Sequence, residues 1–240
     1  MRIITQFNRF LLCLMLALVS SGCSQKFNDV SDTMSLAFFG NDDTSLSNYD
    51  ITNLPYASIY ARVNNGPQAF MVLAIAQPIT RSYHATDTSI NTQLNPIQLK
   101  WMSADRAMLV TESGRIVKTV NLPNANLTNS YSDQPDPLML GLHRNSTPTY
   151  WHRYIDWQPG YHSGYTLSSS FTFEGKEVIK LNESPVETLH FSENVSVKSL
   201  DESYINHFWI NPNNGKVLKS LQILAPGQPY IEITLLKPYS

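Results

Sequence analysis

From Tyr56 onward the apolar residues recur at every second position, and this period of two limits the chain to β structure. Such spacing places apolar side chains on one face of a strand. Turn residues such as Asn64-Asn65-Gly66-Pro67 and Pro212-Asn213-Asn214-Gly215 separate the runs. The clearest runs cover residues 57–63, 97–102, 107–112, 115–122, 149–157, 165–174, 176–181, 204–211, 216–224 and 230–236. Residues 68–76 (QAFMVLAIA) are instead nearly continuously apolar, which predicts a strand buried on both faces.

The connections between these runs are of two kinds. Short turns dominate, and Glu174-Gly175-Lys176 is predicted to be one of them. Residues 78–96 are polar and are expected to form a long loop or a weak strand. Residues 123–148 are the largest interruption, and a loop of that length in a compact domain usually has a function. Residues 186–191 and 195–200 continue the β pattern less strongly.

The pattern predicts an all-β fold, an antiparallel meander of about ten or eleven strands. A twisted sheet of that size tends to close or fold on itself, so we expect a barrel-like or self-folded sheet. Residues 51–240 are assigned to this single β domain. Residues 23–50 are expected to form a tether with a short N-terminal helix, and residues 50–53 another capped turn.

The N-terminus is typical of an export signal. Arg2 and Arg9 precede an apolar run of ten residues, 10–19, which is shorter than the roughly twenty residues of a membrane-spanning helix. Small residues then lead directly to Cys23. Residues 18–23 resemble a bacterial lipobox, although Ser20 stands where leucine is usual. The alternative is an ordinary secretory signal followed by a chance cysteine.

Residues 1–22 are therefore predicted to be a lipoprotein signal peptide, and Cys23 the lipidated first residue of the mature protein. Two or more palmitate-type chains on that residue give stable membrane anchoring. Ser24, where aspartate would retain the protein at the inner membrane, predicts an outer-membrane protein that faces the periplasm.

The mature chain has few features of other protein classes. Cys13 lies in the signal, so Cys23 is the single cysteine left and no disulfide is expected. Without the signal the chain has 15 basic and 19 acidic residues, and it has no basic run. Nucleic acid is therefore not expected as a partner.

Several segments resemble one known family, the YjbF/GfcB-type lipoproteins of capsule and exopolysaccharide loci in Gram-negative bacteria. The similarity covers nearly the whole mature chain and includes residues 50–58 (DITNLPYAS), 65–68 (NGPQ), 107–119 (AMLVTESGRIVKT), 136–138 (DPL), 151–153 (WHR) and 204–209 (YINHFW). The resemblance implies an all-β lipoprotein with a role in polysaccharide production or secretion. It implies no catalytic residues.

No residue set in the sequence makes a convincing catalytic site. Residues 160–164 (GYHSG) place Ser163 one position late for a G-x-S-x-G elbow, and a strand follows instead of a helix. Asp133, Asp136 and Asp156 are better explained as turn or ion-pair residues than as the paired carboxylates of a glycosidase. Arg153 is the expected ion-pair partner of Asp156. The six histidines form no ligand motif, so neither a metal nor a cofactor is predicted.

The stretch most suggestive of binding is the aromatic segment 150–157 (YWHRYIDW) with the two residues at 161 and 162. Aromatic rings beside hydrogen-bonding side chains suit sugar rings, and they equally suit a packed core. The candidate glycan- or partner-binding residues are Trp151, Arg153, Asp156, Trp157, Tyr161 and His162.

Three hypotheses of function remain open from the sequence. The first is a non-enzymatic accessory in capsule or exopolysaccharide assembly or export, which binds polysaccharide or an export protein through the 123–148 loop or a sheet edge. The second is a periplasmic carrier of a lipid or lipid-linked molecule. The third, a glycan-processing enzyme, has the least support. An apolar cavity inside the sheet would favour the carrier.

Overall fold

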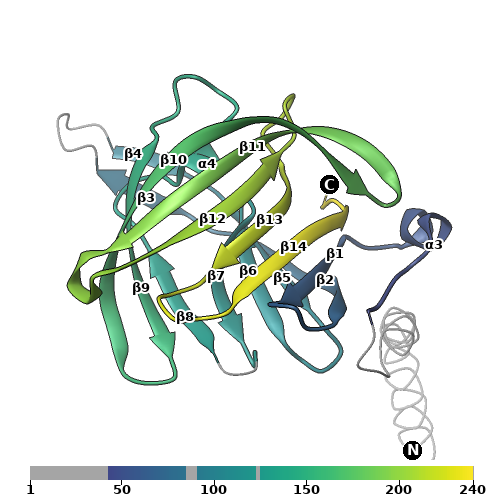
Figure 1. Ribbon diagram of the computed structural model, residues 1–240, viewed down its shortest axis with the longest axis horizontal. Coiled ribbons are helices and arrows are strands. Elements are labelled where there is room, and N and C mark those ends of the chain that lie inside the picture. The colour runs from purple at the N-terminus through teal and green to yellow at the C-terminus, as the bar shows by residue number, and fades with distance from the viewer. Residues whose placement is uncertain (1–42, 85–90, 123–124, 240) are drawn as a thin grey trace, which may run out of the picture. The chain divides into compact units, whose positions relative to one another are not determined.

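The computed structural model describes residues 43–84, 91–122 and 125–239, and these form one antiparallel, barrel-like sheet (Figure 1). The predicted signal peptide, Cys23 and most of the predicted tether lie outside the described residues. The twelve strands of the sheet are, in spatial order, β7 (Arg115–Val120), β6 (Met108–Glu112), β5 (Ile97–Met102), β2 (Gln68–Pro78), β1 (Ser58–Val63), β14 (Tyr230–Lys237), β13 (Val217–Ile223), β12 (Glu202–Ile210), β11 (Ser184–Val197), β10 (His162–Leu181), β9 (Tyr150–Gln158) and β8 (Asn126–Tyr131).

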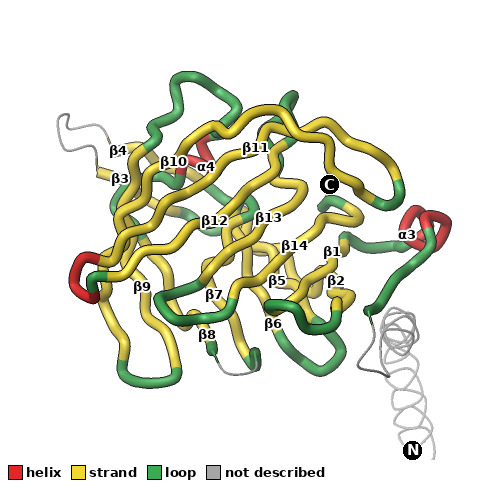
Figure 2. Tube along the Cα trace, in the orientation of Figure 1, coloured by secondary structure: helices red, strands yellow, loops and turns green. Residues whose placement is uncertain are grey.

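Within the described part of the chain, helix occurs only in short pieces, drawn in red in Figure 2. These are α3 (Asn48–Asn53), α4 (Pro137–Leu140) and the 3₁₀ turn η1 (Lys198–Leu200). The capped turn predicted at 50–53 is α3, and its N-cap is Ser47, whose hydroxyl accepts from the amide of Asp50 at 3.1 Å. No helix among the described residues is long and apolar enough to cross a membrane.

The predicted all-β, barrel-like fold is confirmed, but the predicted count of ten or eleven strands is too low. The polar segment 78–96 contains a separate two-stranded ribbon, β3 (Arg81–His84) with β4 (Asn91–Leu94). The segment 123–148 contains β8 and α4. The apolar pattern of β8 is hidden by a register shift between Leu127 and Asn129, which puts its buried residues Leu127 and Ser130 three positions apart.

The predicted turn at Glu174-Gly175-Lys176 is wrong. β10 runs through it as one strand of 20 residues, with a register shift between Phe173 and Gly175. Gly175 adopts a φ of +129°, so a glycine that sequence rules assign to a turn instead accommodates a bulge. The hairpin turn lies at Asn182-Glu183, both with positive φ, and β11 unites the two weaker predicted runs.

The barrel closes between its two edge strands, β7 and β8, which no backbone ladder joins in the described part of the chain. Side chains join them instead. The Thr119 hydroxyl accepts from the amide of Leu127 at 2.9 Å, and Asn126 Oδ1 accepts from the amide of Leu122 at 3.1 Å. The free edges of the sheet therefore face each other, which leaves little edge for another strand to join.

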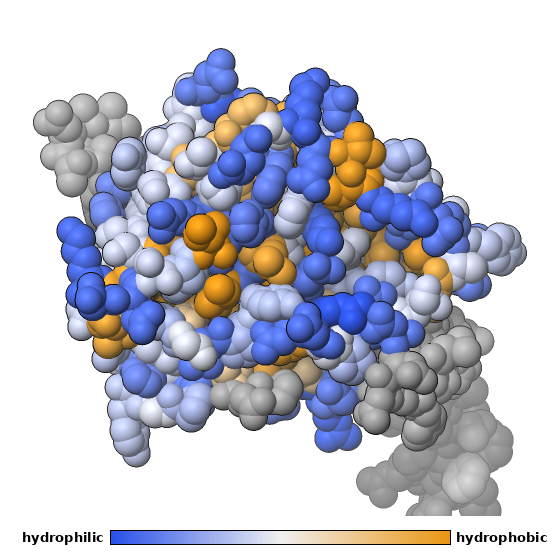
Figure 3. Space-filling view, in the orientation of Figure 1, coloured by the Kyte–Doolittle hydropathy of each residue, from blue (hydrophilic) through white to orange (hydrophobic). Residues whose placement is uncertain are grey.

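Two apolar clusters fill most of the interior. The larger is formed by Ala57, Ile59, Ala61, Met71, Trp101, Leu109, Ile116, Leu127, Ile155, Trp157, Leu167, Val195, Val197, Leu224, Ala225, Ile231 and Ile233. The smaller lies around α4 and contains Leu138, Leu142, Trp151, Phe171, Phe191, Phe208 and Ile210. The outer face over β10–β14 is largely hydrophilic, with scattered hydrophobic residues (Figure 3).

Candidate functional site

The aromatic strand β9 divides its side chains between the barrel interior and the outer face. Trp151, Arg153, Ile155 and Trp157 are all buried, with Trp151 only 4% exposed. Tyr150, on the opposite face, is 74% exposed. Three of the six candidate binding residues, Trp151, Arg153 and Trp157, therefore point into the interior.

The other three candidates lie at the β9–β10 hairpin. The His162 ring stacks on Trp157, with centroids 4.2 Å apart and planes 1° apart. Tyr161 is fully exposed in the turn. Asp156 accepts from the amide of Gly164 at 2.7 Å and from the hydroxyl of Ser163 at 2.9 Å. These bonds hold the pKa of Asp156 below its usual value, and they show a carboxylate that organises the turn.

The predicted ion pair between Arg153 and Asp156 is wrong, because the two side chains lie on opposite faces of β9. Arg153 instead donates to Glu193 Oε1 at 2.7 Å, and Arg115 donates to Glu193 Oε2 at 2.9 Å. Asn206 adds a third bond to Glu193 at 2.8 Å, and Arg115 also pairs with Asp136. We call Arg115, Asp136, Arg153, Glu193 and Asn206 the buried ion cluster.

The buried ion cluster joins strands that are distant in the sequence. Burial alone would raise the pKa of Glu193, but the two guanidiniums outweigh it and hold the pKa far below the usual range. Burial alone would lower the pKa of Arg115, but Asp136 and Glu193 raise it. Two cations and two anions balance, and each carboxylate is bound to arginine. The cluster is therefore built to stay ionised rather than to transfer protons.

Aromatic rings and an amide complete the packing around Arg115. Its guanidinium lies 4.6 Å from the Trp151 ring centroid and 5.3 Å from that of Phe208. Gln222, from β13, reaches across to β7, where it donates to the carbonyl of Gly114 at 2.9 Å and accepts from the amide of Ile116 at 3.0 Å. This part of the interior is filled.

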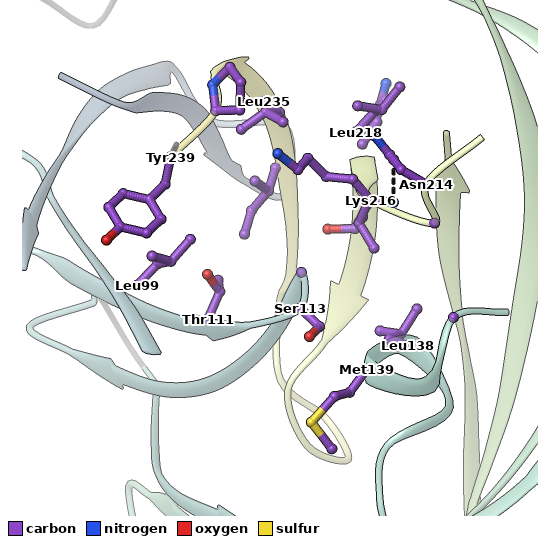
Figure 4. A pocket seen from close by; sticks show the side chains of 18 of the residues that line it. Leu99, Thr111, Ser113, Leu138, Met139, Asn214, Lys216, Leu218, Leu235 and Tyr239 are labelled. Carbon is purple, nitrogen blue, oxygen red and sulfur yellow. Dashed lines mark hydrogen bonds between the residues drawn. The ribbon is translucent and has the colours of Figure 1, made fainter. Parts of the chain in front are cut away.

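One end of the barrel is not filled: a cavity of about 440 Å³ lies there inside the sheet (Figure 4). We call it the mouth cavity. It lies among the start of β5, the end of β6, the start of β13, the end of β14 and the segment from α4 to Arg144. Its apolar wall consists of Ile59, Ile97, Leu99, Trp101, Leu138, Met139, Leu140, Val217, Leu218, Ile233, Leu235 and Tyr239.

The two sides of the mouth cavity belong to different kinds of structure, the sheet on one side and the short helix α4 on the other. Leu99, Leu235 and Tyr239 lie on one side, and Leu138 and Met139 of α4 lie on the other (Figure 4). The first three belong to the sheet or directly follow it. α4 is a single turn of four residues, capped by Asp136, which also belongs to the buried ion cluster. The buried ion cluster thus holds one wall of the mouth cavity in place.

Close backbone contact fixes the next part of that wall. A Cβ on Gly215 would lie 2.3 Å from His143 Nδ1, and one on Gly141 would lie 2.8 Å from His143 Cε1. Both glycines also have positive φ, of 72° and 90°. His143 therefore packs against two positions that glycine alone can occupy, and this contact fastens the α4 segment to the β12–β13 turn.

The polar side chains of the mouth cavity are hydroxyls, the amide of Asn214 and bases. Thr111, Ser113 and Ser220 contribute hydroxyls, and Thr111 already accepts from Trp101 Nε1 at 2.8 Å. No aspartate or glutamate appears among the lining residues within 43–84, 91–122 and 125–239. The described residues also contain no cluster of three or more acidic, histidine or cysteine side chains able to hold a metal ion. The arrangement suits binding better than acid–base chemistry.

Sequence reasoning missed the mouth cavity. Its wall is assembled from strand ends that each look like ordinary apolar alternation, for example Leu99, Leu218 and Leu235. The one local signal was the Asn214-Gly215 turn beside Lys216, which was assigned only to a hairpin.

A third feature is the outer face of β8 and β9. Tyr131 and Tyr154 stack with centroids 5.0 Å apart and planes 25° apart, and Tyr131 is 43% exposed. Tyr150 lies on the same face of β9, and His152 contacts the hydroxyl of Ser168 at 3.1 Å. We call Tyr131, Tyr150 and Tyr154 the outer tyrosine face.

Known proteins resemble this chain along most of its length. The family model "Group 4 capsule polysaccharide lipoprotein gfcB, YjbF" matches residues 31–236. The uncharacterized lipoprotein GfcB of Escherichia coli K12 is 33% identical over 92% of this chain and 95% of its own. The uncharacterized lipoprotein YjbF of the same organism is 31% identical over 95% of each chain.

A solved structure agrees with the fold. The crystal structure of the hypothetical lipoprotein YmcC from Escherichia coli K12 superposes with a TM-score of 0.66 at 33% identity. The match covers 81% of this chain and 90% of that one.

Proposed function

Because the chain belongs to the YjbF family of group 4 capsule polysaccharide lipoproteins, we propose that it is a non-enzymatic accessory in capsule or exopolysaccharide assembly or export. Membership of a lipoprotein family implies an envelope protein held at a membrane. The proposal adds that Cys23 carries the lipid, that the membrane is the outer membrane and that the body faces the periplasm.

The mouth cavity is the observation that carries the proposed mode of action. A concave, mostly apolar pocket with a few polar groups is the usual form of a small-molecule site, and 440 Å³ lies within the common range of about 300–1,000 Å³. Among the residues that the structure describes, its wall has no paired carboxylates. The protein would therefore bind and hold the apolar part of a lipid-linked molecule of the pathway, which unites the accessory and carrier hypotheses.

A cavity-filling substitution tests this function. Leu218 lines the cavity from β13, so Leu218→Trp places an indole ring where the ligand would lie. We expect a loss of surface polysaccharide at unchanged protein level and unchanged membrane fraction. The matched control is Ile205→Trp, which adds the same ring at a position 51% exposed on the outer face of the sheet. Full polysaccharide output from Leu218→Trp would contradict the proposal.

The outer tyrosine face supports glycan contact as a second candidate function. Its stacked rings, of which Tyr131 is exposed and Tyr154 half-buried, lie beside hydroxyl groups and suit the apolar face and polar rim of a sugar. Tyr131→Ala with Tyr154→Ala should weaken retention of the purified polysaccharide on immobilised protein. Tyr49→Ala, which removes an exposed ring on α3, is the control. Equal retention by both variants would contradict this second function.

A further inference from the structure

The charges around the mouth cavity differ from those of the whole chain. The mature protein has more acidic than basic residues, yet the cavity is lined by Arg144, Lys216 and Lys219 and by no acidic residue among those described. Lys219 is paired with Glu232 at 3.2 Å. Arg144 and Lys216 form no ion pair within the described ranges. Two exposed cations are therefore available beside an apolar chamber.

The two cations lie at the exposed end of the mouth cavity, away from the buried part of its apolar wall. Lys216 directly precedes the cavity-lining Val217 and Leu218, and Arg144 follows His143 at the far end of the α4 segment. Both are exposed, whereas Trp101 and Ile59 in the wall are buried. The chamber thus passes from a mostly apolar interior to a cationic, solvent-exposed rim.

We infer that the mouth cavity takes one long hydrocarbon chain that ends in an anionic, phosphate-like head group, with the chain inside and the head between Arg144 and Lys216. This inference rests on the proposed function and specifies its ligand. Burial of each additional CH₂ strengthens binding, so a long chain supplies most of the affinity. The cations supply selectivity, because a neutral head leaves them hydrated and gains nothing from them.

Free sugars fit this chamber less well. A glycan needs many hydrogen-bond partners, and the lining offers few: the hydroxyls of Thr111, Ser113 and Ser220, the amide of Asn214, and the bases. Most of the wall, including Leu99, Leu218 and Leu235, is apolar. α4 contributes Met139, whose flexible side chain adapts to chains of different shape. The chemistry of the wall thus selects hydrocarbon, and the chemistry of the rim selects an anion.

The test compares three simple probes on the full chain, kept in solution by a nonionic amphipol. The probes are dodecyl phosphate, dodecanol and inorganic phosphate, all below micelle-forming concentration. Binding is followed by the fluorescence of Trp101, which lines the cavity, with the variant Trp101→Phe as the spectroscopic blank. Native mass spectrometry counts the bound probes. We expect dodecyl phosphate to bind most tightly, dodecanol more weakly, and phosphate alone not measurably.

Charge reversal separates the rim from the wall. Arg144→Glu with Lys216→Glu should weaken dodecyl phosphate at least about tenfold and change dodecanol less than about twofold. The matched control, Lys118→Glu with Lys198→Glu, makes the same net charge change at two exposed positions away from the cavity and should leave both affinities unchanged. Thermal unfolding of both double variants verifies that they remain folded.

Three results would overturn the inference: equal affinity for dodecanol and dodecyl phosphate, equal weakening by both charge reversals, or no binding of either probe to the wild-type chain. Failure of the proposed function looks different. There, Leu218→Trp would abolish probe binding while surface polysaccharide stays normal.

Discussion

The buried ion cluster and the mouth cavity occupy the same barrel but are built in opposite ways. One pairs two arginines with two carboxylates and an amide, and Glu193 is completely buried. The other leaves about 440 Å³ open between apolar walls. Charges inside a protein demand full pairing, whereas apolar walls tolerate an empty space. The charged region thus fixes the barrel, and the apolar region remains free for a ligand.

The two regions are also connected. Asp136 pairs with Arg115 of the cluster and caps α4, whose residues Leu138 and Met139 form one wall of the cavity. Loss of a charge in the buried ion cluster should therefore shift α4 and with it one wall of the mouth cavity. Four substitutions, at Glu193, Leu167, Leu235 and Tyr204, probe the two regions.

The largest effect is expected from Glu193→Gln, which leaves Arg115 and Arg153 buried without their shared carboxylate. We expect a loss of about 3–5 kcal/mol in the free energy of unfolding, measured by urea titration. The control is Glu187→Gln, which breaks the exposed pair with Lys176 and should cost less than about 1 kcal/mol. Similar small losses from both would show that the cluster does not hold the barrel together.

The difference in stability between wild type and Glu193→Gln should also depend on pH. The pKa of Glu193 is lowered in the folded state, so its stabilising contribution is complete above the unfolded pKa of about 4.3. It is lost only as the pH falls toward the lowered folded value. The stability gap between wild type and Glu193→Gln should therefore stay constant from pH 7 to pH 5 and narrow in stronger acid. A gap that varied near neutral pH would contradict this assignment.

A smaller contrast separates two leucines. Leu167 is completely buried in the larger apolar cluster, whereas Leu235 lines the mouth cavity and is partly exposed. Leu167→Ala should destabilise by about 2–5 kcal/mol because it opens a new cavity. Leu235→Ala only enlarges an existing space and should cost less than half as much. Equal losses in urea unfolding would mean that the mouth cavity is packed in solution.

The smallest effect is confined to high pH. Burial raises the pKa of Tyr204 to about 12. Between pH 10 and 12 the unfolded chain ionises this group and the folded protein does not. Wild type should therefore lose about 2–3 kcal/mol relative to Tyr204→Phe over that interval. The control is Tyr161→Phe at the exposed turn, whose free energy of unfolding should change with pH as that of wild type does. If the Tyr204→Phe variant showed the same pH dependence as wild type, the raised pKa of Tyr204 would be contradicted.

Residue patterns predicted much of the fold. Strict alternation in β9 assigned Trp151, Arg153, Ile155 and Trp157 to one face, and all four share the interior. Alternation failed where a bulge shifts the register, as at Leu127 in β8 and Gly175 in β10. A bulge adds one residue without changing composition, so a local pattern does not distinguish it from a loop or a turn.

The candidate site was harder to predict. The sequence singled out the aromatic strand because its residue types suit sugars, but it did not show which face is covered. The partner of Arg153 is Glu193, forty positions away in the chain, and the nearby Asp156 faces the opposite side. Pairings of that range depend on which strands become neighbours in the barrel.

The amino-acid sequence by itself determined the β class of the body and the resemblance to capsule-associated lipoproteins, because both rest on local order: the period of two and the succession of short motifs. It also carries the prediction of a lipid anchor at Cys23. Tertiary structure alone decided that Glu193 joins Arg115 to Arg153 and that Leu99, Leu218 and Leu235 surround an open space. Those features arise when a sheet of twelve strands curls on itself, since only closure brings distant strand ends together.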